Sequence, residues 1–338
     1  MFVTNSLSGG GAERAMNLAS NELHLRGWTT ALVPINKSAP DFIEPTSEVF
    51  PLMREWRDGL IGTAIAYFKF NRLVASWKPD LIILTCDLPE FFGAGLILRK
   101  QLVIVEEASN PWGTRVFFGK IIRKILMLRG VKTIAASSHL RIWPKRILPD
   151  FVIQNMLTPY ESHRSEEHKL GSLENLIFIG RLSREKQPNW FIEICNLGGF
   201  NGRIIGDGQM RDSLIDFSAN KSVEIKFLGF LNDPWQGFMA DDLLIVPSMS
   251  EGDGLVVIEA IKHGIPLLLS DIPDFRRFAL PERNYCLDVH AFVNRASEYR
   301  NKLQELVVPV EVANTILSSR SAIPIGNKWE EFLSSLQD

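Results

Sequence analysis

Residues 243–270 read LLIVPSMSEGDGLVVIEAIKHGIPLLLS and combine the patterns of one α/β unit. A short apolar run leads into a turn with two glycines, an apolar segment with helical spacing follows, and a second apolar run ends at Ser270. Short β-branched runs that alternate with helical segments indicate parallel strands joined by crossover helices. The segment therefore predicts a strand, a glycine turn, a helix and a second parallel strand.

The same alternation recurs along most of the chain. We expect strands over residues 2–5, 30–35, 81–85, 102–106, 133–137 and 151–154, and then over 176–179, 203–205, 223–228, 243–246 and 267–270. Residues 159–172 are polar and lack apolar periodicity, which is typical of a linker. The sequence predicts an α/β protein with Rossmann-like domains over residues 1–158 and 173–324, a linker over 159–172, and a C-terminal helix over 325–338 that packs across the domains.

Composition narrows the class of protein. The 338 residues fit two domains of about 150 residues each. The 37 basic and 39 acidic residues give a net charge of −2, which argues against nucleic acid as a partner. The three cysteines are too few for a disulfide framework and favour a reducing compartment.

The sequence also contains no segment that resembles a membrane span or an export signal. The longest apolar run, residues 59–68, is shorter than the roughly 20 residues that cross a bilayer, and the N-terminus lacks a signal-peptide pattern. We expect a cytoplasmic protein. Peripheral binding to the inner face of the cytoplasmic membrane is compatible with this location.

The glycine turn suggests an anion site. Gly252 and Gly254 allow a tight turn, and Asp253 is a candidate cap for the helix that follows. Backbone N–H groups at the start of that helix, which includes Leu255 and Val256, can bind anionic oxygen atoms. The turn is therefore a candidate phosphate site.

Two glutamates flank this turn. Glu251 precedes the helix and Glu259 lies within it, so one ligand longer than a phosphate could contact both. A carboxylate repels a neighbouring phosphate, so the useful partners of these glutamates are neutral hydroxyl groups, from which they accept hydrogen bonds. A nucleotide sugar has phosphates flanked by hydroxyl groups and therefore fits this pattern. The alternative for either glutamate alone is an ordinary solvated helix residue.

Here the chain resembles the retaining family 4 glycosyltransferases of the GT-B fold, also called glycosyl transferases group 1. Their signature is two glutamates separated by seven residues after a strand, and Glu251 and Glu259 match it. The resemblance implies two Rossmann-like domains that face each other across a central cleft, with Glu251 in catalysis and Glu259 in donor binding. Asp253 stands where the family usually has an apolar residue.

Further segments of the second half carry the same resemblance. Residues 179–187, IGRLSREKQ, resemble the family segment whose arginine and lysine hold the donor diphosphate, which implies this role for Arg181 and Lys186. Two cations after a strand that ends at Gly180 can stabilise the charge that develops on a leaving diphosphate. Residues 204–211 and 223–229 resemble two more donor-side turns, and they add Gly206 and Gly229 to the donor-binding candidates.

In the first half, residues 5–14, NSLSGGGAER, resemble the family's N-terminal glycine loop. Gly10 and Gly11 match the glycines whose backbone approaches the donor phosphate or the acceptor. The alternatives are a tight turn without a ligand, and a Glu13 that only caps and solvates the helix.

The strand over residues 102–106 leads to a departure from the family. In many relatives it ends at a cleft-facing His or Arg, and here Ala108 replaces that basic residue. Glu107 remains as a candidate partner for an acceptor hydroxyl, and the alternative is an ordinary exposed carboxylate at a strand end.

The resemblance implies a reaction on one face of the sugar, in which the departing phosphate takes the acceptor's proton. We expect no metal, because the histidines lack ligand spacing and Asp241 and Asp242 would point to opposite faces of a strand. We also expect no cofactor, since the nucleotide-diphosphate sugar is a co-substrate.

Residues Arg115 to Arg129, RVFFGKIIRKILMLR, alternate cations with large apolar side chains at helical spacing. Such a helix can lie on an anionic leaflet with its cations among the lipid headgroups. The alternative is a core-packed helix with a solvated basic face. The resemblance favours the membrane.

The leading hypothesis is a retaining glycosyltransferase that moves a hexose or N-acetylhexosamine from a nucleotide-diphosphate sugar, with a UDP-sugar favoured. The acceptor would be a lipid-linked sugar or an oligosaccharide in the synthesis of cell-envelope polysaccharide, lipopolysaccharide or glycolipid. Two alternatives are a sugar-nucleotide epimerase on the same scaffold and a catalytically silent relative that binds at the membrane surface.

Overall fold

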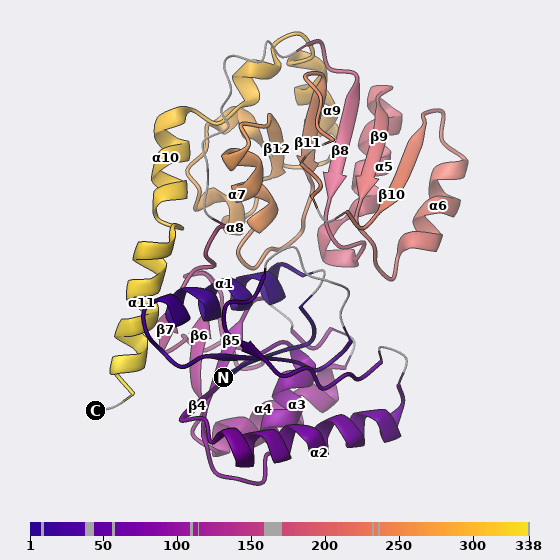
Figure 1. Cartoon of the computed structure of the whole chain (residues 1–338). Coiled ribbons are helices and arrows are strands. Elements are labelled where there is room, and N and C mark those ends of the chain that lie inside the picture. The colour runs from indigo at the N-terminus through magenta and orange to yellow at the C-terminus, as the bar shows by residue number, and fades with distance from the viewer. Residues whose placement is uncertain are drawn as a thin grey trace. The chain divides into compact units, whose positions relative to one another are not determined.

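The computed structural model describes residues 1–7, 10–37, 44–55, 58–108, 111–113, 115–158, 171–231, 233–235 and 237–336. The chain forms two compact units: Met1–Thr158 together with Arg320–Asp338, and Pro159–Ser319 (Figure 1). Apart from residues 171–172, the predicted linker lies outside the described residues.

The first unit is built on a parallel sheet. Its described strands lie in the order β3-β2-β1-β4-β5-β6-β7. They are β1 (Phe2–Thr4), β2 (Ala31–Pro34), β3 (Glu48–Val49), β4 (Leu81–Thr85), β5 (Gln101–Glu106), β6 (Lys132–Ala135) and β7 (Phe151–Val152). Along the chain, β2 and β3 are added on one side of β1, and β4 to β7 are added on the other. In open parallel sheets, ligands bind beyond the carboxyl ends of the strands at the point where the order of addition changes side, here between β1 and β4.

Helices cover both faces of this sheet. They are α1 (Gly11–Leu25) and α11 (Ala322–Ser334) on one face, and α2 (Leu60–Trp77), α3 (Asp87–Ala94) and α4 (Val116–Leu128) on the other (Figure 1). Successive strand residues point to opposite faces, so Phe2 packs with the α1–α11 layer and Val3 with the α2–α3–α4 layer. The C-terminal helix begins at Ala322 rather than at residue 325, and its Trp329 packs edge-on against Phe2.

The second unit repeats the design. Its described strands are parallel in the order β10-β9-β8-β11-β12-β13. They are β8 (Asn175–Ile179), β9 (Asn201–Ile205), β10 (Ile225–Gly229), β11 (Asp242–Val246), β12 (Leu267–Ser270) and β13 (Tyr285–Cys286). The main helices are α5 (Pro188–Gly198), α6 (Arg211–Ala219), α7 (Leu255–Lys262), α8 (Pro273–Arg276), α9 (Val289–Glu298) and α10 (Val310–Ser318).

Two features are absent from the described residues. Among the described residues, no helix is both long enough and apolar enough to cross a membrane. The same residues contain no group of three His, Cys, Asp or Glu side chains that could hold a metal ion.

Candidate active site

The predicted cation segment and the predicted glutamate turn meet at the carboxyl ends of β8 and β11. Lys186 ends the 3-10 helix η1 (Arg184–Lys186), and its Nζ lies 2.5 Å from Oε1 of Glu251. Ser248 Oγ donates to the same carboxylate oxygen at 3.0 Å. The backbone N–H of Met249 also donates to the carbonyl of Glu185 at 2.8 Å, so main-chain and side-chain contacts join the two loops.

The Lys186–Glu251 ion pair is only partly accessible to water. The side chain of Glu251 is 6% exposed and that of Lys186 is 25% exposed. The carboxylate is thus held inside the turn, whereas the ammonium group keeps contact with solvent. Asp274 of α8 stabilises the turn, because its carboxylate accepts a hydrogen bond from the backbone N–H of Glu251 at 2.7 Å.

Gly254, and not Asp253, is the N-cap of α7. Its φ of 62° is left-handed, a conformation that glycine adopts without strain, and glycine has no side chain with which to cap the helix. The expected cap at Asp253 is therefore wrong: this residue lies one position before the N-cap, and its carboxylate accepts from Nη2 of Arg277 at 3.1 Å. Helix geometry gives the N–H groups of Leu255 and Val256 no acceptor within α7, and Gly252 precedes them in the turn.

Glu259 lies in the second turn of α7 and is half-buried. The indole Nε1–H of Trp235 donates to its Oε2 at 3.3 Å, and the same ring stacks on His263 with centroids 5.4 Å apart and planes 15° apart. No local pattern predicts a role for Trp235, because this residue lies in the irregular connection between β10 and β11.

Three of the predicted glycines lie side by side at the ends of β8, β9 and β10. Gly180 donates to the carbonyl of Ile205 at 3.0 Å, and Gly206 donates to the carbonyl of Gly229 at 2.7 Å. A Cβ at Gly206 would lie 1.9 Å from the carbonyl oxygen of Gly180, and φ of Gly206 is 138°. Only glycine fits there, and the exposed Arg181 follows directly on this edge.

The glycine loop of the first unit leads into α1, with Gly10 as its N-cap and Gly11 as its first residue. A Cβ at Gly10 would lie 1.7 Å from Oε2 of Glu13. Glu13 is buried, and its carboxylate lies against Gly10 instead of extending into water. The absence of a side chain at residue 10 thus makes room for Glu13.

Glu107 follows β5 at the carboxyl edge of the first sheet. It is half-buried, and its Oε2 accepts a hydrogen bond from Nδ2 of Asn155 at 2.9 Å, so it is not an ordinary exposed carboxylate. The neighbouring Cys86 follows β4 with a left-handed φ of 69°. Burial raises the pKa of its thiol, and the nearby carboxylates of Glu13, Asp87 and Glu107 raise it further.

A buried network of ion pairs links α3 and α4 to the carboxyl end of β5. The Arg123 side chain of α4 lies 2.6 Å from Glu90 of α3 and 2.8 Å from Glu106, the last residue of β5. Burial raises the pKa of Glu106 to about 7 and outweighs the opposing effect of Arg123. The expectation that all cations of residues 115–129 are exposed is therefore wrong for Arg123, which is fully buried.

Comparison with known proteins identifies the second unit. Residues 160–303 match the model of the family described as glycosyl transferases group 1. These residues are a glycosyl transferases group 1 domain.

Similarity to known glycosyltransferases extends over both units. An uncharacterized glycosyltransferase of Haemophilus influenzae is 22% identical over 79% of this chain and 78% of its own length. A Campylobacter jejuni GalNAc-alpha-(1->4)-GalNAc-alpha-(1->3)-diNAcBac-PP-undecaprenol alpha-1,4-N-acetyl-D-galactosaminyltransferase is 24% identical over 77% of this chain and 76% of its own.

A solved structure confirms the predicted fold. The chain superposes on Anabaena Alr3699/HepE, solved in complex with UDP and glucose, with a TM-score of 0.73. The match covers 99% of this chain and 98% of that one at 18% identity. The chain has the GT-B fold, with two parallel-sheet domains and C-terminal helices.

Proposed function

We propose that the protein is a retaining, family 4-like glycosyltransferase. It would transfer a hexose or N-acetylhexosamine from a UDP-sugar to a lipid-linked or oligosaccharide acceptor in cell-envelope polysaccharide, lipopolysaccharide or glycolipid synthesis. The observation that carries this proposal is the 2.5 Å ion pair between Lys186 and Glu251 beside the start of α7. It joins a cation for a diphosphate, a carboxylate for sugar hydroxyls and a helix N-terminus in one loop cluster.

The proposed reaction needs charge stabilisation more than it needs a protein base. The bond between the sugar's anomeric carbon and the diphosphate breaks, the acceptor oxygen bonds to that carbon, and the acceptor's proton moves to a phosphate oxygen. Lys186, Arg181 and the first N–H groups of α7 would stabilise the negative charge that grows on the diphosphate. Glu251 and Glu259 would accept hydrogen bonds from donor hydroxyls, and the proposal assigns no step to a metal or cofactor.

The compared proteins support the substrate classes. The HepE structure was solved with UDP and glucose, and the name of the Campylobacter relative specifies an acceptor linked to undecaprenol through a pyrophosphate. In the first unit we assign the acceptor side to the edge that bears Gly10, Gly11 and Glu107. The carboxylate of Glu107, held by Asn155, would accept a hydrogen bond from an acceptor hydroxyl.

We also propose that the first unit docks on an anionic membrane through α4. The exposed face of this helix combines Phe117 and Leu128, each 79% exposed, with the exposed Lys120 and Lys124. Large apolar side chains that point to water between cations are typical of interfacial helices. A core-packed helix with a purely basic solvent face would instead have buried these apolar side chains.

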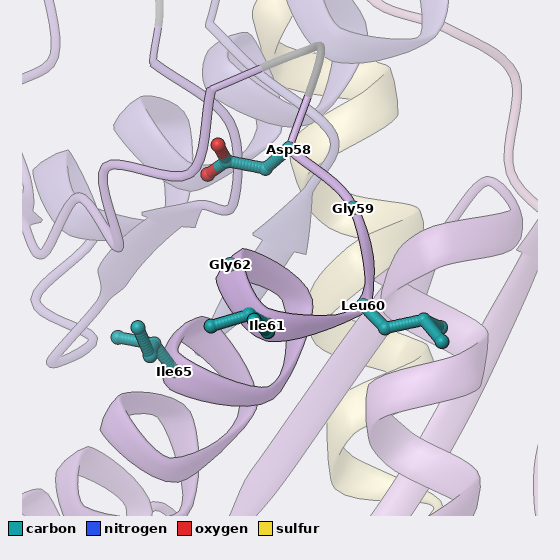
Figure 2. A pocket seen from close by; sticks show the side chains of 6 residues that line it. All are labelled: Asp58, Gly59, Leu60, Ile61, Gly62 and Ile65. Atoms are coloured by element: carbon teal, nitrogen blue, oxygen red, sulfur yellow. The ribbon is translucent and has the colours of Figure 1, made fainter.

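The start of α2 bears a second group of exposed apolar side chains. Leu60 and Ile61 are 90% and 80% exposed, and together with Ile65 they line a shallow hollow that Asp58, Gly59 and Gly62 complete (Figure 2). The helices α2 and α4 belong to the layer that covers the same face of the sheet as α3 (Figure 1). We propose that the exposed apolar side chains of both helices contact the leaflet.

Donor binding tests the enzymatic proposal. A panel of UDP-, GDP- and ADP-sugars should include one that raises the melting temperature, because a ligand that binds only the folded state stabilises it. Glu251→Ala should abolish transfer and donor hydrolysis while nucleotide binding persists. Binding without turnover by the wild-type protein, with any donor and acceptor, would favour the catalytically silent alternative.

Vesicle sedimentation tests the membrane proposal. At low salt, vesicles that contain anionic phosphatidylglycerol should retain the protein better than neutral phosphatidylcholine vesicles, because cations on α4 attract anionic headgroups. Phe117→Ser with Leu128→Ser should reduce retention. Leu25→Ser is the matched control, since Leu25 is also well exposed but lies on α1, on the opposite face of the sheet. Equal recovery with both vesicle types would refute docking.

A further inference from the structure

Trp235 is fixed by contacts with three side chains. Its indole N–H donates to Oε2 of Glu259 at 3.3 Å, and its ring stacks on His263 and on Phe238, with centroids 5.4 Å and 5.7 Å away. Glu259 and His263 lie four residues apart on α7 and therefore share one face of that helix. The indole thus lies along this face, with its polar edge on the carboxylate and its ring on the imidazole.

The chemistry of the indole limits what it can do for Glu259. An indole N–H is a donor only, so it stabilises the ionised carboxylate and restricts its orientation. A glutamate on a helix surface otherwise samples several rotamers, and holding one of them costs entropy when a ligand binds. A carboxylate oxygen can accept more than one hydrogen bond, so the contact with Trp235 leaves Glu259 able to accept hydroxyl groups.

We propose that Trp235 is a positioning residue for the nucleotide-sugar donor. Its N–H holds the Glu259 carboxylate in the orientation that accepts donor hydroxyls, and its stacking on His263 holds the indole in place. This inference rests on the proposed function, because it takes Glu259 as a donor-binding residue. Trp235 itself does not have to contact the reacting atoms.

The test removes the N–H and keeps an aromatic ring. Trp235→Phe should raise the dissociation constant of UDP, measured by calorimetry, by about 10-fold, because the released Glu259 side chain must lose rotamer freedom when UDP binds. In steady-state assays with the donor that shifts the melting temperature most, KM should rise by a similar factor and kcat should stay within about twofold.

Trp77→Phe is the matched control. Trp77 is also half-buried, and its indole N–H also donates to a carboxylate, that of Glu48 at 3.2 Å, but it lies in the first unit. It should leave UDP affinity unchanged. Urea unfolding of both variants separates a loss of folded protein from a loss of affinity.

A double-mutant cycle with Glu259→Ala decides the proposal. If Trp235 acts through Glu259, Trp235→Phe should change UDP affinity by less than about twofold in the Glu259→Ala background, since coupled residues are non-additive. Equal weakening in both backgrounds would overturn the proposal, as would an unchanged affinity in Trp235→Phe alone. If Glu259→Ala binds UDP normally while Lys186→Met does not, this inference fails and the proposed function survives. A wild-type protein that binds no nucleotide diphosphate would refute both.

Discussion

Replacing Lys186 with methionine removes an ammonium group and keeps most of the aliphatic stem. Exposed ion pairs contribute about 0.2–1 kcal/mol, and breaking a fully buried pair costs about 3–5 kcal/mol. The Lys186–Glu251 pair lies between these limits, with side chains 25% and 6% exposed, and Ser248 still donates to the carboxylate in the variant. We therefore expect a loss of about 1–2 kcal/mol in the free energy of unfolding. In a domain of this size, that loss lowers the melting temperature by about 2–8 °C.

The effect of Lys186→Met on the reaction should be much larger. Loss of one preorganised group that stabilises transition-state charge lowers kcat by about 10²- to 10³-fold. Calorimetry with UDP and with uridine locates the effect, because the ammonium should contact the diphosphate and not the nucleoside. UDP affinity should fall, uridine affinity should not, and Lys186→Arg should retain part of both affinity and turnover. A variant that loses stability but keeps its UDP affinity and its kcat would show that the pair is structural only.

Three further predictions concern the rest of the fold. Gly206→Ala places a Cβ 1.9 Å from the carbonyl oxygen of Gly180 and should lower the free energy of unfolding by at least about 2 kcal/mol, measured by urea denaturation; a change below 1 kcal/mol would contradict it. Trp329→Ala removes a buried ring from the core of the first unit and should cost about 3–5 kcal/mol in the same assay; a much smaller loss would show that α11 contributes little to that unit. Because the pKa of Glu106 is raised to about 7 in the folded protein, the folded state binds this proton more tightly than the unfolded chain, and the free energy of unfolding should fall as pH rises from about 5 to 7. Glu106→Gln should flatten that slope in denaturation series, and an unchanged slope would assign it to other groups.

The sequence predicted the strands of both sheets well where turn residues mark their ends. The predicted ranges 81–85 and 267–270 match β4 and β12 residue for residue. The sequence analysis did not predict β3 and β13, which are only two residues long, although it did predict the equally short β7 within residues 151–154. The predicted strand over 223–228 begins two residues late as β10, a boundary set by pairing with β9 and not by local composition.

The residues of the candidate site were predictable only where they belong to a short, continuous sequence motif. The resemblance of residues 179–187 and 251–259 to family motifs identified Lys186 and Glu251, and the structure brings these two side chains together. Trp235 comes from a segment without periodicity, and folding alone places its indole beside Glu259. Arg123 was misplaced for a related reason: its partners Glu90 and Glu106 come from other elements, and only their convergence makes a buried guanidinium tolerable.

The chain leaves the first unit at Thr158 and returns to it at Arg320, and this route determines which fragments can fold by themselves. A fragment that stops at residue 158 would lack α11, so Phe2 and the apolar residues around it would face water where Trp329 and Phe332 normally lie. Such a fragment should aggregate unless residues 320–336 are supplied in trans or fused to it. The second unit is continuous in sequence and needs no such complement.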